Sequence, residues 1–262
     1  MSKQRKHKDL KCIGRHGQNH RARKRRAKVE RHWVLVITGC GGGSSNDRPR
    51  GNANVSGNRH ATATSSSVPT TADLDFFIVQ SGTSLASSLV LLNGTPCASQ
   101  GTLTGTVDQQ AVDLTIRESD GPDTITVPGS TDGITISGSY SISGSCDGGD
   151  TGTFFANFIP TVDSSRWSGD TNSVNGTLTF TADLREDSHG NLNGTMSFSR
   201  SPCFTDLTVT GNQVGSAVRL RDTQGIFEAF ANTNDQATSI SGDYSVLSGA
   251  CAEDGTFSMS RP

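Results

Sequence analysis

The sequence predicts an all-β protein with two tandem, homologous antiparallel domains, each expected to form a small barrel or a sandwich. Three observations support this prediction: a composition poor in helix formers, a two-residue alternation of apolar and hydroxyl side chains, and a long internal repeat. Each copy of the repeat is expected to form a meander of about seven or eight short strands.

The composition is low in large apolar residues and in helix formers. Leu, Ile, Val and Phe together make up about one fifth of the 262 residues, and Ser, Thr and Gly are abundant. Such a chain is a poor helix former, so it is expected to be either disordered or built from strands and turns. No run of 18 apolar residues occurs, which excludes a conventional transmembrane helix.

The alternation of apolar and polar residues favours strands over disorder. Residues 134–143 read ITISGSYSIS, so the large apolar side chains fall on one face and the Ser and Thr side chains on the other. Turn-forming dipeptides separate such segments, for example Asn93-Gly94, Asp132-Gly133 and Asn193-Gly194. Short alternating segments between tight turns are typical of half-buried antiparallel strands.

An internal repeat organises residues 73–262. The segment ISGSYSI at 136–142 matches ISGDYSV at 240–246, and Pro-Cys at 96–97 matches Pro-Cys at 202–203. The two tyrosines of the chain, Tyr140 and Tyr244, occupy equivalent positions. We therefore expect a first β-domain at 73–160 and a second at 161–262.

A resemblance to lipocalin-like β-barrels is limited to the second copy. Trp167 lies near the start of its expected first strand and a meander follows it, which loosely resembles the plan of those barrels. The resemblance covers only this general plan, and the first copy has no Trp.

The charges of the chain are segregated, although the formal net charge is only −2. Residues 1–32 contain 13 Lys and Arg residues against Asp9 and Glu30, whereas residues 33–262 contain 10 Arg, no Lys and 23 acidic residues. The β-domains are therefore expected to be acidic and to bind no nucleic acid.

The segment after the basic stretch has the layout of a secretory signal. An apolar run begins at Trp33 and leads to Ile37-Thr38-Gly39-Cys40, followed by a Gly/Ser run. This tetrad resembles the lipobox of bacterial lipoproteins. The resemblance implies that residues 1–39 form a cleaved basic leader, that Cys40 carries a lipid, and that residues 40–72 form a disordered, flexible tether.

Two other interpretations of the N-terminal segment are open. Residues 1–32 could be a disordered tail with Cys40 a free thiol. Alternatively, Arg23-Lys24-Arg25-Arg26 could be a nucleic-acid or nuclear-targeting patch.

Six cysteines are distributed in a regular way. Beyond Cys12 and Cys40, each copy contains two, and within-copy pairing is the only pairing that each copy can make alone. We therefore predict the disulfides Cys97–Cys146 and Cys203–Cys251, which require an oxidising compartment. The alternative is two pairs of reduced, buried cysteines.

The sequence contains no recognisable catalytic or cofactor-binding motif, and we expect no cofactor and no enzymatic activity. His189 lies in a polar loop, which argues against a catalytic triad. Trp167 is the aromatic residue we would test first for ligand contact, with Tyr140 and Tyr244 as further candidates. Weak candidates for calcium ligands are Asp147, Asp150, Glu253 and Asp254, in turns of the two copies.

These observations together predict a cellular location more clearly than a molecular activity. We expect a lipid-anchored protein of the bacterial cell envelope, at the outer membrane or cell surface, with a structural or interaction role and an envelope protein as its partner. The duplicated Ser/Thr/Gly-rich domains resemble those of bacterial envelope lipoproteins. One alternative is a β-barrel that binds a small hydrophobic ligand, and another is an enzyme acting on polysaccharide.

Overall fold

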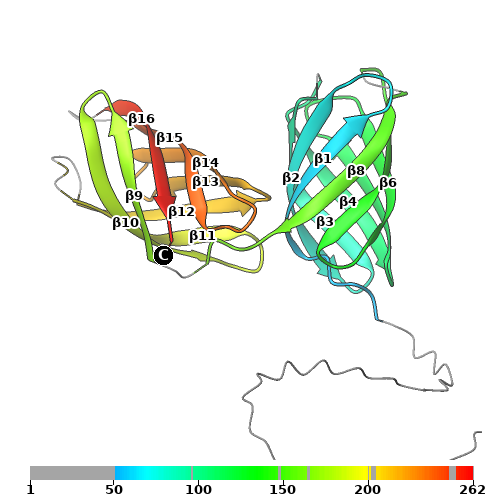
Figure 1. Cartoon of the computed structure of the whole chain (residues 1–262), viewed down its shortest axis with the longest axis horizontal. Coiled ribbons are helices and arrows are strands. Elements are labelled where there is room, and N and C mark those ends of the chain that lie inside the picture. The colour runs from blue at the N-terminus through cyan, green and yellow to red at the C-terminus, as the bar shows by residue number, and fades with distance from the viewer. Residues whose placement is uncertain are drawn as a thin grey trace, which may run out of the picture. The chain divides into compact units, whose positions relative to one another are not determined.

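The structure, a computed structural model, describes residues 51–95, 97–146, 149–163, 166–199, 201, 205–247 and 252–261. Every helix or strand in this part of the chain is a β-strand (Figure 1). The sixteen strands form two closed barrels in sequence order, β1 to β8 and β9 to β16. The prediction of an all-β protein with two tandem antiparallel domains is thus confirmed, and both domains are barrels rather than sandwiches. No membrane-spanning helix occurs among the residues that the structure describes.

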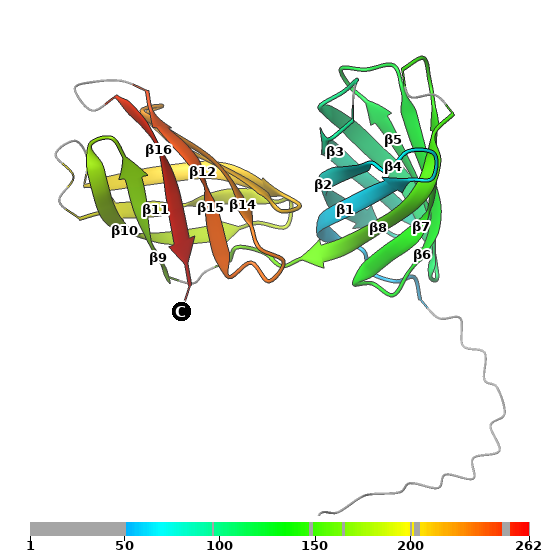
Figure 2. The ribbon, with the colours of Figure 1, turned by 45° about the horizontal axis from the view of Figure 1, so that its top comes forward.

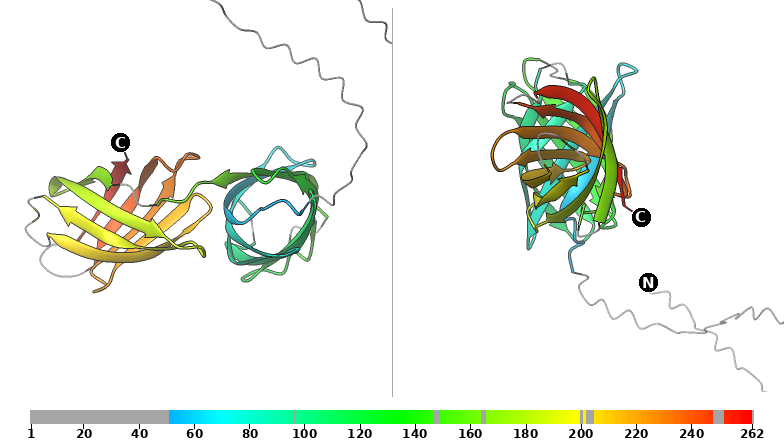
Figure 3. Two further views of the ribbon diagram at one scale, coloured as in Figure 1. Left: turned by 90° about the horizontal axis from the view of Figure 1, so that it is seen from below. Right: turned by 90° about the vertical axis from the view of Figure 1, so that its left-hand side faces the viewer.

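Barrel 1 is an up-and-down meander in which each strand pairs with the next along the chain. Its strands are β1 (Gly57–Ser65), β2 (Thr71–Ser81), β3 (Ser84–Asn93), β4 (Gln100–Asp108), β5 (Ala111–Glu118), β6 (Thr124–Thr131), β7 (Thr135–Ser143) and β8 (Thr151–Ile159). Pairing of β1 with β8, for example Ala61 with Ala156, closes the ring. Figure 3 shows barrel 1 nearly along its axis as this closed ring of strands.

Barrel 2 repeats the same topology. Its strands are β9 (Arg166–Ser173), β10 (Gly176–Glu186), β11 (Asn191–Phe198), β12 (Asp206–Val214), β13 (Ala217–Asp222), β14 (Phe227–Thr233), β15 (Ser239–Val246) and β16 (Glu253–Ser260) (Figure 2). The ring closes through β16 and β9, where Phe257 pairs with Thr171. The two tyrosines lie on equivalent strands, Tyr140 on β7 and Tyr244 on β15.

The first barrel begins earlier than the sequence predicts. Residues 57–65 lie within the expected tether of 40–72, yet they form β1 and pair with both β2 and β8. This strand lacks large aliphatic residues: its inward positions include Ala61 and the fully buried Arg59. Without β1 the ring could not close, so the first domain includes residues that the sequence assigns to the tether.

Each barrel has one end closed by the segment that precedes its first strand. In barrel 1, Val55 is fully buried and donates its backbone N–H to Oε1 of Gln80 at 2.8 Å. In barrel 2, Val162 is also fully buried and donates to Oε2 of Glu186 at 3.1 Å. We call these the plugged ends.

The opposite end of barrel 1 carries the predicted disulfide. Cys97 in the β3–β4 loop is bonded to Cys146 in the β7–β8 loop, so the bond joins loops from opposite sides of the ring. We call this the disulfide end; it comprises the described residues of loops 66–70, 94–99, 119–123 and 144–150. Cys203 and Cys251 lie outside the described residues, so the second disulfide stays a prediction.

Candidate functional site

A buried tyrosine and a carboxylate form a hydrogen-bonded cluster at the disulfide end of barrel 1. The Tyr140 hydroxyl donates to Oδ2 of Asp150 at 2.7 Å. Ser65 and Ser67 donate to Oδ1 of the same carboxylate at 2.8 and 2.9 Å. The bond from Tyr140 is the largest influence on the pKa of Asp150 and lowers it, with further lowering by the two serines. Asp150 is therefore an anion at neutral pH.

Barrel 2 contains the same cluster with different residues. Tyr244 donates to Oε1 of Glu253 at 2.7 Å, while Ser173 and Asn175 donate to Oε2, each at 2.8 Å. Burial opposes ionisation of Glu253, but these hydrogen bonds outweigh it and lower the pKa. The duplication of the cluster indicates that it has a structural role in both barrels.

Glycine makes room for each tyrosine ring. A Cβ atom on Gly152 would lie 2.6 Å from the Tyr140 ring, and one on Gly255 would lie 2.7 Å from the Tyr244 ring. The ring of each tyrosine therefore lies against the backbone of the neighbouring strand, with its hydroxyl at the rim of the barrel. Each carboxylate then fixes the ring in that place.

A pocket of about 480 Å³ lies beside the cluster of barrel 1. Its walls are inward-facing side chains of β1, β2, β6, β7 and β8, namely Ala63, Ala72, Leu74, Ile125, Ile142 and Phe154. At its rim lie Tyr140, Asp150, Ser65 at the end of β1, and Ser67 and the half-exposed Val68 of the β1–β2 loop. The pocket is thus mostly apolar, with a few polar groups gathered on one side.

Among the described residues, five aromatic rings cluster at the corresponding end of barrel 2. The ring centroids of Phe180 and Phe198 are 5.3 Å apart, and those of Phe198 and Phe227 are 6.3 Å apart. Phe227 stacks on Tyr244 at 5.9 Å, and Phe257 lies 6.4 Å from Phe180. These five rings pack against one another in the core beside the Tyr244 cluster.

The strand registers show that smaller residues occupy the same positions in barrel 1. Leu74, paired with Leu92, corresponds to Phe180, which is paired with Phe198. In the same way, Ile125, paired with Ile142, corresponds to Phe227, which is paired with Val246. Aliphatic side chains in place of phenyl rings therefore leave space at the disulfide end of barrel 1.

The disulfide lies next to this pocket. Gly94 and Thr95, three and two residues before Cys97, line the pocket. On the other side, the backbone N–H of Cys146 donates to Oδ1 of Asp123 at 3.2 Å. The bond therefore holds two loops that border the pocket.

The other predicted site residues lie in different places. Trp167 is fully buried near the plugged end of barrel 2, where Arg261 lies over its ring, and its Nε1 has no hydrogen-bond partner among the described residues. It lies in the core, away from the Tyr244 cluster at the other end of β9. Cys40 and Asp147 lie outside the described residues.

The calcium candidates do not come together. Asp150 and Glu253 lie in different barrels and accept hydrogen bonds from hydroxyl groups, and Asp254 accepts one from Ser245. No group of three or more metal-ligating side chains occurs among the residues that the structure describes. The geometry in this part of the chain therefore gives the calcium alternative no support.

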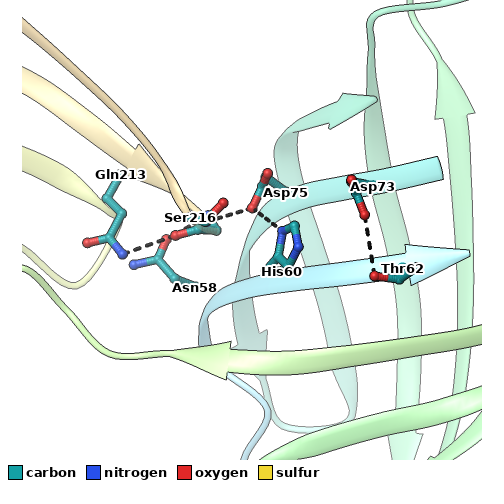
Figure 4. A network of polar contacts seen from close by, with 8 residues as sticks. Asn58, His60, Thr62, Asp73, Asp75, Gln213 and Ser216 are labelled. Carbon is teal, nitrogen blue, oxygen red and sulfur yellow. Dashed lines mark hydrogen bonds and ion pairs between the residues drawn. The ribbon is translucent and has the colours of Figure 1, made fainter. Parts of the chain in front are cut away.

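A second polar cluster joins the two barrels, which belong to one compact unit of the chain (Figure 4). The side chain of Asn58 on β1 accepts a hydrogen bond from the backbone N–H of Gly215 at 3.1 Å and donates to Oε1 of Glu186 at 2.7 Å. Burial raises the pKa of Glu186 to about 7, although the hydrogen bonds from Asn58 and Val162 oppose the shift.

The same cluster continues onto β2. The backbone N–H of Ser216 donates to Oδ1 of Asp75 at 2.6 Å, and Nδ1 of His60 lies 3.0 Å from the same oxygen (Figure 4). The hydrogen bond with Asp75 raises the pKa of His60, against an opposing effect of burial. Two titratable groups therefore lie where the barrels meet.

Comparisons with known proteins add little to this geometry. No protein-family model and no curated protein matches the sequence. Among solved structures, the chain matches the Myxococcus xanthus hemagglutinin in complex with a3,a6-mannopentaose, with 12% identity over 78% of this chain and 100% of that one. The TM-score is 0.21, which supports no inference about function.

The sequence did not locate the pocket. Two of its walls, Ala63 and Ala72, lie in the stretch that the sequence assigns to the tether, or at its boundary. The signal that could have found the site was the tyrosine pair, since Tyr140 borders the pocket and Tyr244 borders the aromatic cluster that fills barrel 2.

Proposed function

We propose that this protein binds a small, mostly apolar molecule at the disulfide end of barrel 1. The observation that carries the proposal is the pocket of about 480 Å³ beside Tyr140 and Asp150. Its volume falls within the range of small-molecule sites, and such sites are typically apolar with a few polar groups that orient the ligand.

The comparison of the two barrels supports the proposal. Both barrels have the tyrosine–carboxylate cluster, so the presence of the cluster does not by itself explain the pocket in barrel 1. At the equivalent positions, barrel 2 has the larger Phe180 and Phe227 where barrel 1 has Leu74 and Ile125. Core positions ordinarily fill to close packing, so a cavity kept in one copy of a duplicated fold favours a ligand there.

The protein's role in this proposal is binding rather than catalysis. Among the described residues that line the pocket, Asp150 is the one carboxylate, so they offer no second carboxyl for glycoside hydrolysis. Barrel 2 would then serve as a structural partner. We further propose that a lipidated Cys40 anchors both barrels to the cell envelope, a proposal that rests on the Ile37-Thr38-Gly39-Cys40 sequence alone.

A fluorescence titration with the neutral dye N-phenyl-1-naphthylamine tests binding. The variant Ala72→Leu/Leu74→Phe/Ile125→Phe introduces large side chains into the pocket, and two of these changes copy the rings of barrel 2. We expect the wild-type chain to bind about one equivalent of dye and this variant to lose most of the binding.

A matched control separates filling of the pocket from a general effect of added rings. Ile134→Phe/Leu247→Phe makes two similar changes at exposed positions, 66% and 49% accessible, and is expected to bind like the wild type. Circular dichroism verifies that each variant is folded. Equal dye binding by the filled variant and the control would contradict the proposal and leave a scaffold role.

The anchor has its own test. Cells fed a fatty-acid analogue are expected to label the wild-type chain and not the Cys40→Ala variant. Equal labelling of both chains, or of neither, would contradict lipidation at Cys40.

A further inference from the structure

The disulfide end of barrel 1 carries negative charge without a compensating base in its loops. The described residues of loops 66–70, 94–99, 119–123 and 144–150 include three aspartates, Asp120, Asp123 and Asp150, and no Lys, Arg or His. Arg117 is near this end but is exposed on the outer face of β5. A molecule that enters the pocket therefore passes through a negative field.

One of these carboxylates belongs to the pocket itself. Asp150 lines the cavity together with Leu74 and Ile125, so an apolar surface and an anion meet in one site. Each of its oxygens accepts hydrogen bonds from hydroxyl groups, which fix its position, and the carboxylate retains acceptor capacity. A carboxylate only accepts, so it offers no hydrogen bond to an anionic head group.

We propose that the pocket of barrel 1 selects amphipathic cations, in which an ammonium group lies against Asp150 and an apolar tail lies between Leu74, Ile125 and Phe154. This inference rests on the proposed function and names the chemical class of its ligand. A charge-assisted hydrogen bond from an ammonium to a carboxylate is stronger than one from a neutral hydroxyl group. An anionic amphiphile of the same length would meet repulsion.

Barrel 2 provides an internal control. Glu253 accepts hydrogen bonds from Tyr244, Ser173 and Asn175, as Asp150 does from Tyr140 and two serines. Among the described residues, the core beside Glu253 holds the rings of Phe180, Phe227 and Phe257 where barrel 1 has smaller aliphatic side chains. Removing the charge of Glu253 is therefore expected to leave ligand selection unchanged. Removing the charge of Asp150 is expected to abolish the selection.

Displacement of N-phenyl-1-naphthylamine from the full chain measures this selection. Three competitors share a ten-carbon tail: decylamine, decanol and decanoate, each below its micellar concentration, at pH 7 and low salt. For the wild type we expect decylamine to bind about tenfold more tightly than decanol, and decanoate to bind more weakly than decanol.

The variant Asp150→Asn preserves the size and the acceptor oxygen but removes the charge. We expect it to bring decylamine and decanol within about threefold of each other, whereas Glu253→Gln retains the wild-type ratio. If Asp150→Asn does not fold, the wild type alone tests the inference. Its affinity for decylamine relative to decanol is expected to fall as salt is raised from 0.02 to 0.5 M, because salt screens the attraction between the ammonium group and Asp150.

The outcomes of this experiment separate the two proposals. If decylamine and decanol displace the dye equally from the wild type, the cation preference is wrong while the binding function stands. If the ratio is unchanged in Asp150→Asn, Asp150 is not the recognising group and the inference is overturned. If the wild type binds no dye, the proposed function itself fails.

Discussion

The guanidinium of Arg59 lies 5.3 Å from the centroid of the Phe158 ring, across the seam where β1 and β8 close barrel 1. In barrel 2 the equivalent seam brings Arg261, directly after β16, to 5.5 Å from the ring of Trp167 on β9, so the cation and the aromatic ring have exchanged sides of the seam. The contact is the same although its two residue types are swapped. Closure of both barrels near the plugged end therefore uses a cation–π pair.

Substitution of Arg59 is expected to be more damaging than substitution of Arg261. Arg59 is fully buried and donates hydrogen bonds to the backbone oxygens of Val55, Gly133 and Ile134. Arg59→Met leaves these carbonyl groups without their donor, so we expect a loss of about 2–4 kcal/mol in the free energy of unfolding. Arg261→Met, at a half-buried position, should cost about 1 kcal/mol.

Urea unfolding followed by circular dichroism measures both changes. A smaller loss for Arg59→Met than for Arg261→Met would show that the buried guanidinium is not what holds the seam.

Glu186 gives the stability of barrel 2 a defined pH dependence. Its pKa is raised from 4.5 to about 7, so the folded protein retains a proton that the unfolded chain has lost over this interval. The stability contributed by Glu186 is therefore complete below pH 4.5 and is lost as the pH rises through 7. His60, whose pKa is also raised, contributes stability that is lost as the pH rises through its folded value.

The variant Glu186→Gln removes the titration of Glu186. An amide can replace the carboxyl group here, because the side chain of Gln80 accepts the equivalent hydrogen bond at the plugged end of barrel 1. The stability of Glu186→Gln relative to the wild type should rise by about 2–3 kcal/mol between pH 4.5 and 7.5 and then level off. Thermal melts of both chains at a series of pH values test this. A difference that does not vary with pH would be inconsistent with the raised pKa.

Much of the fold could be predicted from the sequence because it rests on local patterns. Alternating apolar residues marked most strands, and the repeat at Tyr140 and Tyr244 marked the duplication. The Cys97–Cys146 bond followed from the count of two cysteines per copy. Strand β1 was missed because its inward residues, including Ala61 and Arg59, are not the large aliphatic residues that signal a strand.

The pocket could not be predicted for a different reason. Its volume depends on which side chains meet across the barrel, and this follows from register and closure rather than from neighbours in sequence. Leu74 and Ile125 look like ordinary core residues until the registers align them with Phe180 and Phe227.

The disulfide of barrel 1 should stabilise the fold strongly. The bond closes a loop with a sequence separation of 49 residues, and we expect Cys97→Ser/Cys146→Ser to lower the free energy of unfolding by about 4 kcal/mol. Urea unfolding of the variant without reductant gives the value. A loss below about 1 kcal/mol would mean that the rest of the barrel holds these loops.

The second predicted disulfide has a simpler test. Alkylation of the unfolded, unreduced protein followed by peptide mass analysis should leave Cys97, Cys146, Cys203 and Cys251 all unlabelled. Labelling of Cys203 and Cys251 would contradict the second pair alone.

Barrel 2 is expected to gain a binding site when its rings are removed. Phe180→Leu/Phe227→Ile gives it the residues that barrel 1 has at the same positions, at a cost of about 1–2 kcal/mol for each change. We expect this variant to bind about two equivalents of N-phenyl-1-naphthylamine instead of one. An unchanged stoichiometry, with the fold intact, would show that ring size does not control the space.

Methyl NMR can determine whether the ligand of barrel 1 binds inside the disulfide end. A titration of the methyl-labelled chain with decylamine should shift Leu74, Ile125 and Ile142, which line the pocket. Val209 and Leu220 in the core of barrel 2 should stay unchanged. Shifts confined to barrel 2, or no shifts in the pocket at saturating decylamine, would show that decylamine does not bind at the disulfide end of barrel 1.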